Sequence, residues 1–366
     1  MPDSPAEKPP GISSRKAEHI ALCETDEVAF KQVTTLLEQV QLVHDALPEL
    51  AISEVDLSTD FAGKRLRAPV IIAAMTGGTD QAEAINRDLA ALAERFGLGF
   101  GFGSQRPLLS GITKGYDVRD VAPTALILGN IGVVQARQTS TAALRELVAR
   151  CGADALVVHL NPAMELVQPG GDQDFRGGLE TIRRLVGELD VPLVVKETGC
   201  GLSREVGERL VAAGVKWVDT SGAGGTSWVG VEALRATGEG RRLGELFWDW
   251  GIPTAASVAQ LDGLGLGVCA TGGVASGVDI ARAIALGARC GGIARPLLQA
   301  RARGGVDELN AKIAGILDEL RVIHLLTGSR TPEVLRTKSV VLGAQLARWM
   351  PRGGPLSRRA MTPHSP

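Results

Sequence analysis

The sequence KWVDTSGAGGTSW at residues 216–228 joins a short apolar run to a cluster of polar and glycine residues. The apolar run predicts a β-strand at 216–219, and the glycines and hydroxyl side chains after it are typical of a turn. Seven further runs share this pattern, at 69–74, 98–101, 125–128, 155–159, 193–196, 268–271 and 290–293.

Amphipathic helical runs separate these strands. We expect helices at 81–96, 139–151, 179–189, 204–213, 254–261 and 277–286, and a longer helix at 306–326. The alternation of strands and helices indicates βαβ units that build a parallel sheet. Eight such strands fit either a closed (β/α)8 barrel or an open doubly wound sheet.

The ends of the strands favour the barrel. Polar or glycine clusters follow nearly every strand, as in MTGG at 75–78, GSQR at 103–106 and GNIG at 129–132. In a barrel all eight C-terminal ends meet at one mouth, whereas an open sheet concentrates its chemistry at one switch point. We therefore expect an α/β fold, a (β/α)8 TIM barrel over residues 68–350 with an N-terminal extension and a long loop after strand six.

Composition assigns the remaining segments. Residues 1–11 and 351–366 are rich in Pro, Gly, Ser and Arg, which predicts flexible tails. In the N-terminal extension at 12–67, we expect the RKAEH start at 15–19 and a helical run at 31–43 to reach over the mouth. The loop at 222–253 is long, and loops of this length are usually functional, so we expect an active-site lid there.

The 366 residues are 45% apolar and 22% charged, with a formal net charge of −2. These values exclude a largely disordered chain and argue against a general nucleic-acid or membrane-surface role. The five cysteines are odd in number and none has CxxC spacing, so neither a disulfide framework nor a zinc site is expected. The sequence shows no transmembrane run and no signal-peptide pattern, so we expect a cytoplasmic protein.

Two strand ends predict a site for a phosphate-bearing cofactor. The seventh strand ends in Thr271-Gly272-Gly273 and the eighth in Ala294-Arg295. Barrels often bind phosphate there through backbone N–H groups and a helix N-terminus, and glycine allows the close approach. The alternative is a pair of tight βα turns.

Polar residues also end the middle strands. Lys196 could stabilise an electron-rich cofactor atom, form a Schiff base, or pair with Glu197 or another carboxylate. His159 and Asn161 lie two residues apart and can face one side, where the histidine binds phosphate, transfers a proton or is only structural. Glu165 is either a Mg2+ ligand beside substrate phosphates or a surface carboxylate.

Basic and aromatic side chains form two further groups. The basic group consists of Arg15, Lys16, His19 and Arg106. It could clamp a diphosphate, because arginine binds phosphate through two N–H groups and lysine acts as a point charge. The expected lid holds three of the five tryptophans, which are Trp228, Trp248 and Trp250. These tryptophans either form the wall of an apolar pocket or anchor the loop.

The motifs above resemble the type 2 isopentenyl-diphosphate isomerases. The resemblance spans residues 13–345 and is carried, in order, by SRKAEHI (14–20), MTGG, GSQR, NIG, HLNPAMELVQPGGD (159–172), VKE, DTSGAGGTSW, FWDWGIPT (247–254), ATGG and TGSRTPEVL (327–335). It implies a (β/α)8 barrel that interconverts isopentenyl and dimethylallyl diphosphate with reduced FMN and Mg2+, while NADPH only keeps the flavin reduced. It also implies a homotetramer or homo-octamer.

The resemblance assigns roles to individual residues. The implied FMN contacts are Met75, Thr76, Gly77, Ser104, Asn130, Lys196, Ser221, Thr226, Gly272, Gly273, Val274, Ala294 and Arg295. The implied contacts of the isoprenoid diphosphate are Arg15, Lys16, Ser104, Gln105, Arg106, His159, Asn161 and Trp228. Glu165 matches the metal ligand, and the implied catalytic centre holds Glu232, His159 and Met164.

One position departs from the family pattern. The family has Gln immediately before the metal-binding Glu, whereas this chain has Met164. A thioether has no proton to donate, so Met164 cannot relay protons. Either reduced FMN handles both proton transfers, with help from Glu232, or the activity is low or redirected.

The alternatives are another FMN-dependent barrel oxidoreductase and a non-catalytic protein that binds FMN or a prenyl diphosphate. A 2-hydroxy-acid oxidase needs a histidine in an SxHGG-like motif, and none of the five histidines lies in one. An IMP dehydrogenase-like enzyme needs a nucleophilic cysteine in a glycine-rich loop, and Cys200 in TGCGLS is the nearest match.

Overall fold

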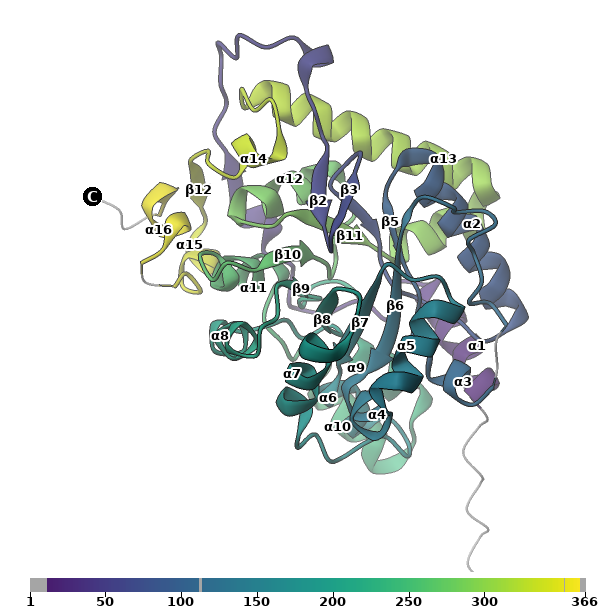
Figure 1. Ribbon diagram of the computed structural model, residues 1–366. Helices are drawn as coiled ribbons and strands as arrows, with labels where there is room; N and C mark the ends of the chain where they lie inside the picture. Colours follow the sequence, from purple (N-terminus) through teal and green to yellow (C-terminus); the bar gives the residue numbers. More distant parts are fainter. Residues whose placement is uncertain (1–11, 112–113, 352, 363–366) are drawn as a thin grey trace, which may run out of the picture.

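The computed structural model describes residues 12–111, 114–351 and 353–362, and its centre is a closed barrel of eight parallel strands (Figure 1). In ring order the strands are β4 (Val70–Ile72), β5 (Gly99–Gly101), β6 (Leu126–Gly132), β7 (Ala155–Leu160), β8 (Leu193–Glu197), β9 (Trp217–Asp219), β10 (Gly267–Ala270) and β11 (Cys290–Ile293). The ring closes where Gly291 of β11 lies opposite Val70 of β4. Each expected strand overlaps one of these, so the predicted TIM barrel is confirmed.

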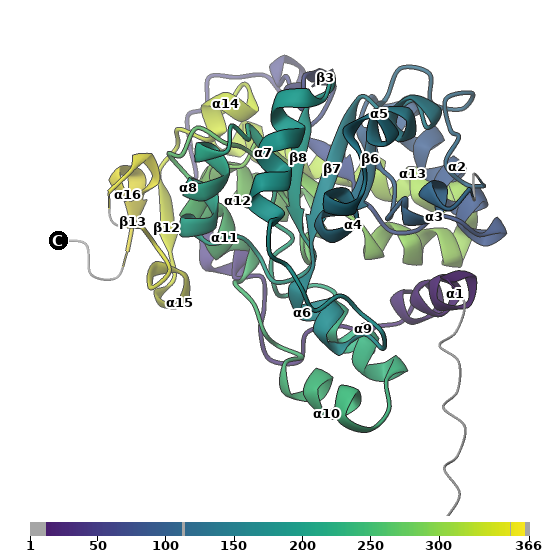
Figure 2. The same ribbon diagram turned by 60° about the horizontal axis from the view of Figure 1, so that its bottom comes forward.

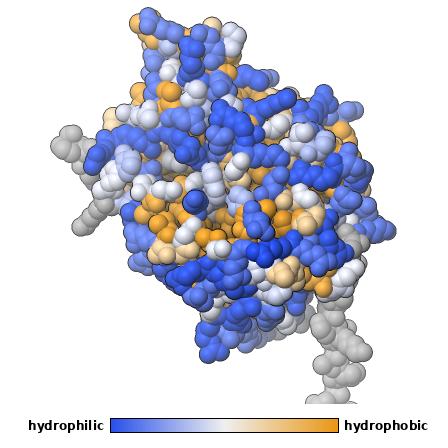
Figure 3. Space-filling view, viewed as in Figure 1, coloured by the Kyte–Doolittle hydropathy of each residue, from blue (hydrophilic) through white to orange (hydrophobic). Residues whose placement is uncertain are grey.

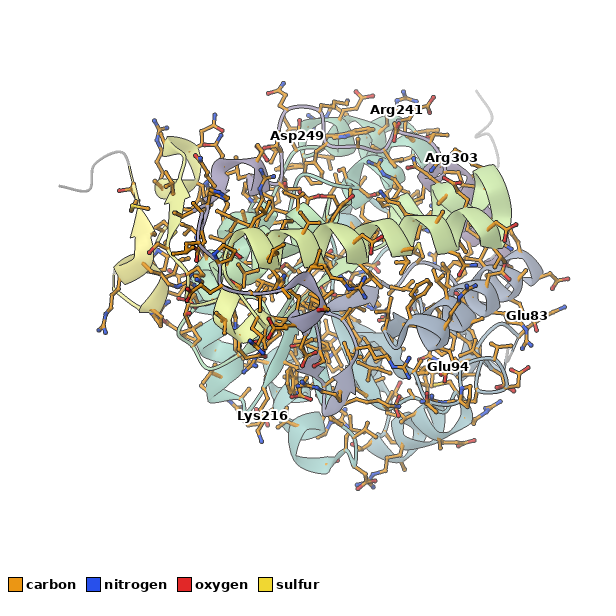
Figure 4. The ribbon with its side chains drawn as sticks, turned by 90° about the horizontal axis from the view of Figure 1, so that it is seen from above. Glu83, Glu94, Lys216, Arg241, Asp249 and Arg303 are labelled. Atoms are coloured by element: carbon orange, nitrogen blue, oxygen red, sulfur yellow. The ribbon has the colours of Figure 1, made fainter. Side chains whose placement is uncertain are left out.

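Helices surround the barrel, and all of them except α4 lie where the amphipathic runs predict a helix. They are α2 (Asp80–Phe96), α4 (Val133–Gln138), α5 (Thr141–Arg150), α7 (Gly178–Glu188), α8 (Arg204–Ala212), α11 (Thr254–Leu261), α12 (Gly277–Leu286) and α13 (Arg295–Leu326). The helix expected at 306–326 is the second half of α13, which bends at Gly304 and Gly305; Gly305 has a φ of +63°. Figure 4 shows α13 crossing the molecule beside α2, where Arg301 donates to Asp88 over 2.7 Å.

A hairpin closes the N-terminal end of the barrel. It consists of β2 (Thr59–Phe61) and β3 (Lys64–Leu66), and its Phe61 and Leu66 side chains are buried in the barrel interior. The interior side chains they pack with are Ile71, Leu126, Leu128, Ala155, Val157, Val194, Cys269 and Cys290. Because this apolar plug fills the lower barrel, the opposite end is left for a ligand.

Short helices gather at that opposite end, as Figure 2 shows. They are α1 (Ile12–Cys23), α3 (Arg106–Leu109), α6 (Pro162–Val167), α9 (Trp228–Arg235) and α10 (Gly238–Leu246). The segment at 222–253, expected as a loop, is therefore largely helical. Its first helix, α9, begins after Ser227, whose hydroxyl accepts from Gly230 N (2.9 Å) and donates to Trp248 O (2.7 Å).

A small separate sheet pairs a strand of the N-terminal extension with the C-terminal region, and here the structure differs from two predictions. The run at 31–43 is not an α-helix, because it contains only the short 3-10 helix η1 (Leu37–Gln39) and the strand β1 (Val40–Leu42). Strand β1 is antiparallel to β12 (Val340–Leu342), which pairs in parallel with β13 (Ala360–Met361).

The described part of the tail expected at 351–366 is thus structured, with α16 (Pro355–Arg359) before β13 and Leu356 buried. The other short elements are η2 (Ile52–Glu54), α14 (Pro332–Leu335) and α15 (Ala344–Ala347). Among the described residues no helix is both long and apolar enough to span a membrane. Figure 3 shows a largely hydrophilic rim around an apolar centre on the face seen in Figure 1.

Candidate active site

A cavity of about 310 Å³ opens at the C-terminal ends of the barrel strands. Residues at or just beyond the end of every barrel strand line it, from Ala73 after β4 to Ala294 after β11. Side chains of α1 and Trp228 of α9 complete the wall. The volume lies in the range of small-molecule sites, and its place is the one expected for a barrel enzyme.

Most of the residues selected from the sequence line this cavity. They are Arg15, Lys16, Met75, Thr76, Ser104, Arg106, Asn130, His159, Asn161, Met164, Glu165, Lys196, Ser221, Thr226, Trp228, Gly272, Gly273, Val274, Ala294 and Arg295. Three selected residues are not part of the cavity wall, and these are Gly77, Gln105 and Glu232. Gly77 packs against the ring of Tyr116, and the fully buried Gln105 accepts from Asn130 N over 2.7 Å.

One part of the cavity fits a phosphate group. Gly272 and Gly273 have φ angles of +97° and +74°, which glycine adopts without strain. Nearby, α13 begins at Arg295 with no side chain capping its first N–H groups. Backbone N–H groups of this kind bind anions. Three buried polar atoms on the wall, Thr76 Oγ1, Thr198 Oγ1 and Arg295 Nη1, have no hydrogen-bond partner in the described chain, so the wall offers groups to a ligand.

Lys196 is held at the wall by an ion pair. Its Nζ lies 3.1 Å from Asp219 Oδ1 and 3.1 Å from Thr271 Oγ1. The neighbouring Glu197 is not this partner, because its carboxylate accepts from the backbone N–H groups of Cys200 and Gly201. Burial raises the pKa of Glu197 to about 8. Of the roles that the sequence leaves open for Lys196, the geometry supports an ion pair with a carboxylate other than Glu197, namely Asp219.

The tautomer of His159 follows from its neighbours. Asn130 Nδ2 donates to Phe102 O over 2.9 Å, so Asn130 Oδ1 faces His159 Nδ1, at 2.8 Å. An amide oxygen only accepts, so Nδ1 carries the proton and Nε2 remains available. Burial, with a smaller contribution from Lys196, lowers the pKa of His159 to about 4, so the ring is neutral at pH 7.

Glu165 has the surroundings of a single-carboxylate cation site. Its Oε1 accepts from Asn161 Nδ2 over 2.8 Å, and its Oε2 accepts from Asp172 N over 2.8 Å and from Gln168 Nε2 over 3.3 Å. No group of three or more His, Cys, Asp or Glu side chains within the described ranges could hold a metal. One carboxylate suits Mg2+ completed by phosphate oxygens and water, and does not suit a zinc centre.

Lys16 makes contacts that its sequence pattern does not predict. Its ammonium donates to Gly77 O, to Ser104 O over 3.2 Å and to Tyr116 OH over 2.9 Å. Burial and the nearby Arg15 lower the pKa of Lys16 to about 8. All three N–H groups are therefore bonded within the protein, and Lys16 links α1 to the loops after β4 and β5.

The three tryptophans of the expected lid have different roles. Trp228 lines the cavity, whereas Trp248 is buried and donates from Nε1 to Ala29 O over 2.8 Å. Lys31 Nζ lies 3.8 Å from the centre of the Trp248 ring. Trp250 is 61% exposed. The pocket-wall interpretation thus holds for Trp228, and the anchoring interpretation holds for Trp248.

Sequence reasoning missed some of the wall. The cavity wall also includes Gln135, Gln168 and Thr198, which the sequence patterns do not identify. Tyr116 supports the wall by donating to Ser104 O. Gln168 and Thr198 lie in or directly beside motifs that end a strand, so proximity to those motifs was an available signal. Tyr116 is the single tyrosine of the chain, and nothing in the pattern around it points to the site.

Comparison with known proteins places the chain among related sequences. It matches the family described as FMN-dependent dehydrogenase over residues 11–165 and 165–342. It is 43% identical to the isopentenyl-diphosphate delta-isomerase of Methanothermobacter thermautotrophicus over 350 residues, which cover 94% of this chain and 97% of the relative.

Two further similarities extend this finding. The chain is 47% identical to the isopentenyl-diphosphate delta-isomerase of Synechococcus sp., with 89% of this chain and 97% of the relative covered. A solved structure of a flavocytochrome b2 variant with sulfite bound superposes with a TM-score of 0.66 at 19% identity, covering 87% of this chain and 81% of that one. At that identity the superposition shows the shared fold.

Proposed function

This chain belongs to the isopentenyl-diphosphate delta-isomerases of the FMN-dependent dehydrogenase family, and we propose that it interconverts isopentenyl and dimethylallyl diphosphate with reduced FMN and Mg2+. The observation that carries the proposal is the pair of separate anion-binding groups on one cavity wall. Gly272, Gly273 and Arg295 suit a cofactor phosphate, while Arg15, Arg106 and His159 supply positive charge and a ring nitrogen for a diphosphate.

The substrate diphosphate is bound by groups that the protein leaves available. Arg15 and Arg106 line the cavity, and neither guanidinium makes a hydrogen bond with another described residue. Arginine binds phosphate oxygens through two parallel N–H groups. His159 completes this end, because Asn130 fixes Nδ1 as the protonated nitrogen and leaves Nε2 free. Uptake of a proton at Nε2 together with the diphosphate would let this nitrogen donate to a phosphate oxygen.

Glu165 would hold Mg2+ beside the diphosphate. Hydrogen bonds from Asn161, Gln168 and the backbone of Asp172 orient its carboxylate. The cation would share its charge between this carboxylate and the phosphate oxygens, which favours the bound diphosphate.

The remaining wall would hold FMN and the isoprenoid tail. When bound and kept reduced by NADPH, the flavin supplies acid–base chemistry for a double-bond shift without net oxidation. Lys196, fixed by Asp219, places positive charge at the wall and favours an electron-rich ligand. Trp228 and Met164 provide apolar surface that excludes water from the tail.

The alternative oxidoreductase functions fit the site less well. Of the described histidines only His19 and His159 line the cavity, and neither follows a late barrel strand. Burial and the neighbouring Glu197 raise the pKa of the Cys200 thiol, which disfavours the thiolate that a nucleophile needs.

The test is turnover by the FMN-loaded enzyme under anaerobic, reducing conditions. We expect dimethylallyl diphosphate to form in the presence of Mg2+ and its formation to stop when the cation is chelated. The Glu165→Gln variant should need a higher Mg2+ concentration for turnover. Asp174→Asn, which changes an exposed carboxylate nearby in the chain, is the matched control. Flavin reduction by lactate or glycolate without NADPH, with no isomerisation, would contradict the proposal. We also expect a homotetramer or homo-octamer, which sedimentation measures.

A further inference from the structure

His19 lies on the cavity wall without a role in the site described above. It belongs to α1, and its Nε2 lies 2.8 Å from Oε1 of Glu232. The Glu232 side chain is fully buried and is not part of the cavity wall. The resemblance placed this carboxylate at the catalytic centre, but in the structure it is His19 that reaches the cavity.

Arg235 and Trp228 hold the pair in place. Arg235 donates from Nη1 to Glu232 Oε2 over 2.6 Å, and from Nε to Glu18 Oε2 over 2.7 Å. The ring of Trp228 meets the His19 ring edge-to-face at 5.4 Å between centroids. The imidazole therefore has a set orientation, with Glu232 behind it and Trp228 beside it on the cavity wall.

The hydrogen bond to Glu232 engages Nε2 and leaves Nδ1 as the ring nitrogen available to a ligand. A carboxylate paired with Arg235 only accepts, so His19 Nε2 carries the ring proton. In the part of the chain that the structure describes, Nδ1 makes no hydrogen bond. In its uncharged form the ring presents a lone pair at Nδ1, and the negative charge of Glu232 at the opposite nitrogen strengthens this electron-rich edge.

An electron-rich edge has a use in the proposed reaction. Protonation of the terminal alkene carbon places positive charge on the branched carbon of the isoprenoid tail, and groups aimed at developing charge lower the barrier. Met164 also lines the cavity, but its thioether is a weak acceptor and carries no charge.

We propose that His19 is a catalytic residue that stabilises the positive charge developing on the isoprenoid tail, and that Glu232 is a positioning residue that acts through it. This inference rests on the proposed isomerisation. His19 binds the tail only through charge and contact, so no atom is transferred to or from the ring.

The test measures binding of a cationic mimic in addition to turnover. The binding measurement gives a result even when the enzyme shows no turnover. The probe is a diphosphate that carries a tertiary ammonium group where the substrate has its branched carbon. Its affinity and that of isopentenyl diphosphate are measured by calorimetry on the FMN-loaded, Mg2+-containing enzyme. The variants are His19→Gln, Glu232→Gln and the double variant, with the exposed His44→Gln as the matched control.

We expect His19→Gln to weaken binding of the ammonium probe about 10–100-fold and to lower kcat by a similar factor, with less than about a threefold change for isopentenyl diphosphate. Glu232→Gln should also weaken binding of the ammonium probe and lower kcat, by smaller factors. The double variant should be no worse than His19→Gln, because the two residues act as a unit. FMN affinity should be unchanged, which shows that each variant folds.

Three results would overturn the proposal. One is equal weakening of the ammonium probe and the neutral substrate, which assigns His19 to general binding. The second is tighter binding of the probe by His19→Gln, which shows that the ring is itself cationic. The third is additive losses in the double variant, which shows that Glu232 does not act through His19. If the unaltered enzyme produces no dimethylallyl diphosphate, the proposed function fails, while the probe still reports on His19.

Discussion

The partly buried His159 should make the protein sensitive to acid. Desolvation of its ring, with a smaller contribution from Lys196, lowers its pKa from 6.5 to about 4. The unfolded chain therefore takes up a proton on this histidine before the folded protein does. Stability that is fully present above about pH 6.5 is lost as the pH falls towards about 4, with no further loss below that value.

The magnitude follows from the two pKa values. The difference between 6.5 and about 4 corresponds to about 3 kcal/mol, of which about 2 kcal/mol is lost by about pH 5. Glu197 acts in the opposite sense, because its raised pKa of about 8 makes the folded state more stable as the pH falls from about 8 towards 4.5. A comparison with His159→Gln isolates the histidine, since both proteins retain Glu197.

Two assays test this. An NMR titration of the histidine ring signals in the substrate-free protein should show His159 neutral down to about pH 5. The free energy of unfolding is measured in urea at about pH 7.5 and about pH 5. Between these two pH values it should fall by about 2 kcal/mol more in the unaltered protein than in His159→Gln. A ring pKa at or above 6.5, or equal losses in the two proteins, refutes the reasoning.

Three further predictions concern the walls of the site and its lid. Gly225→Ala should weaken FMN binding about 10–100-fold in a fluorescence titration, because a Cβ there would overlap the backbone nitrogen of Gly273; Gly315→Ala, with open space around it, should bind FMN normally. Tyr116→Phe should lower the free energy of unfolding by about 1–2 kcal/mol in urea, because the Lys16 ammonium and Ser104 O lose a partner, and an unchanged value would show that this bond adds nothing. Trp248→Ala should cost about 3–5 kcal/mol in the same assay and Trp250→Ala less than about 1 kcal/mol, and similar costs would show that burial does not distinguish them.

The sequence predicts the barrel well because each strand is marked twice, by an apolar run and by the polar cluster that follows it. The same clusters predict the cavity wall, since a closed barrel brings all strand ends to one mouth. Asn161 and Glu165 follow one strand and are bonded to each other over 2.8 Å in the structure. Residues placed by the strand register are therefore predictable from local patterns.

What the sequence does not predict depends on contacts between distant segments. Lys16 carries the pattern of a phosphate ligand, but its three N–H groups are bonded within the protein because Tyr116 and two loop carbonyls surround it. Glu232 is buried behind His19, which lies more than two hundred residues earlier in the chain. The run at 31–43 has a helical pattern, yet pairing of β1 with β12 determines its structure.

The central claim is that this chain shifts a carbon–carbon double bond with no net oxidation. The most direct measurement is NMR of isopentenyl diphosphate incubated anaerobically in D2O with the FMN-loaded enzyme, NADPH and Mg2+. We expect dimethylallyl diphosphate with deuterium in its methyl group and at C2, and no NADPH consumption beyond that needed to reduce the flavin. An unchanged substrate spectrum from enzyme shown to hold reduced flavin, or NADPH oxidised in proportion to product, would contradict the claim.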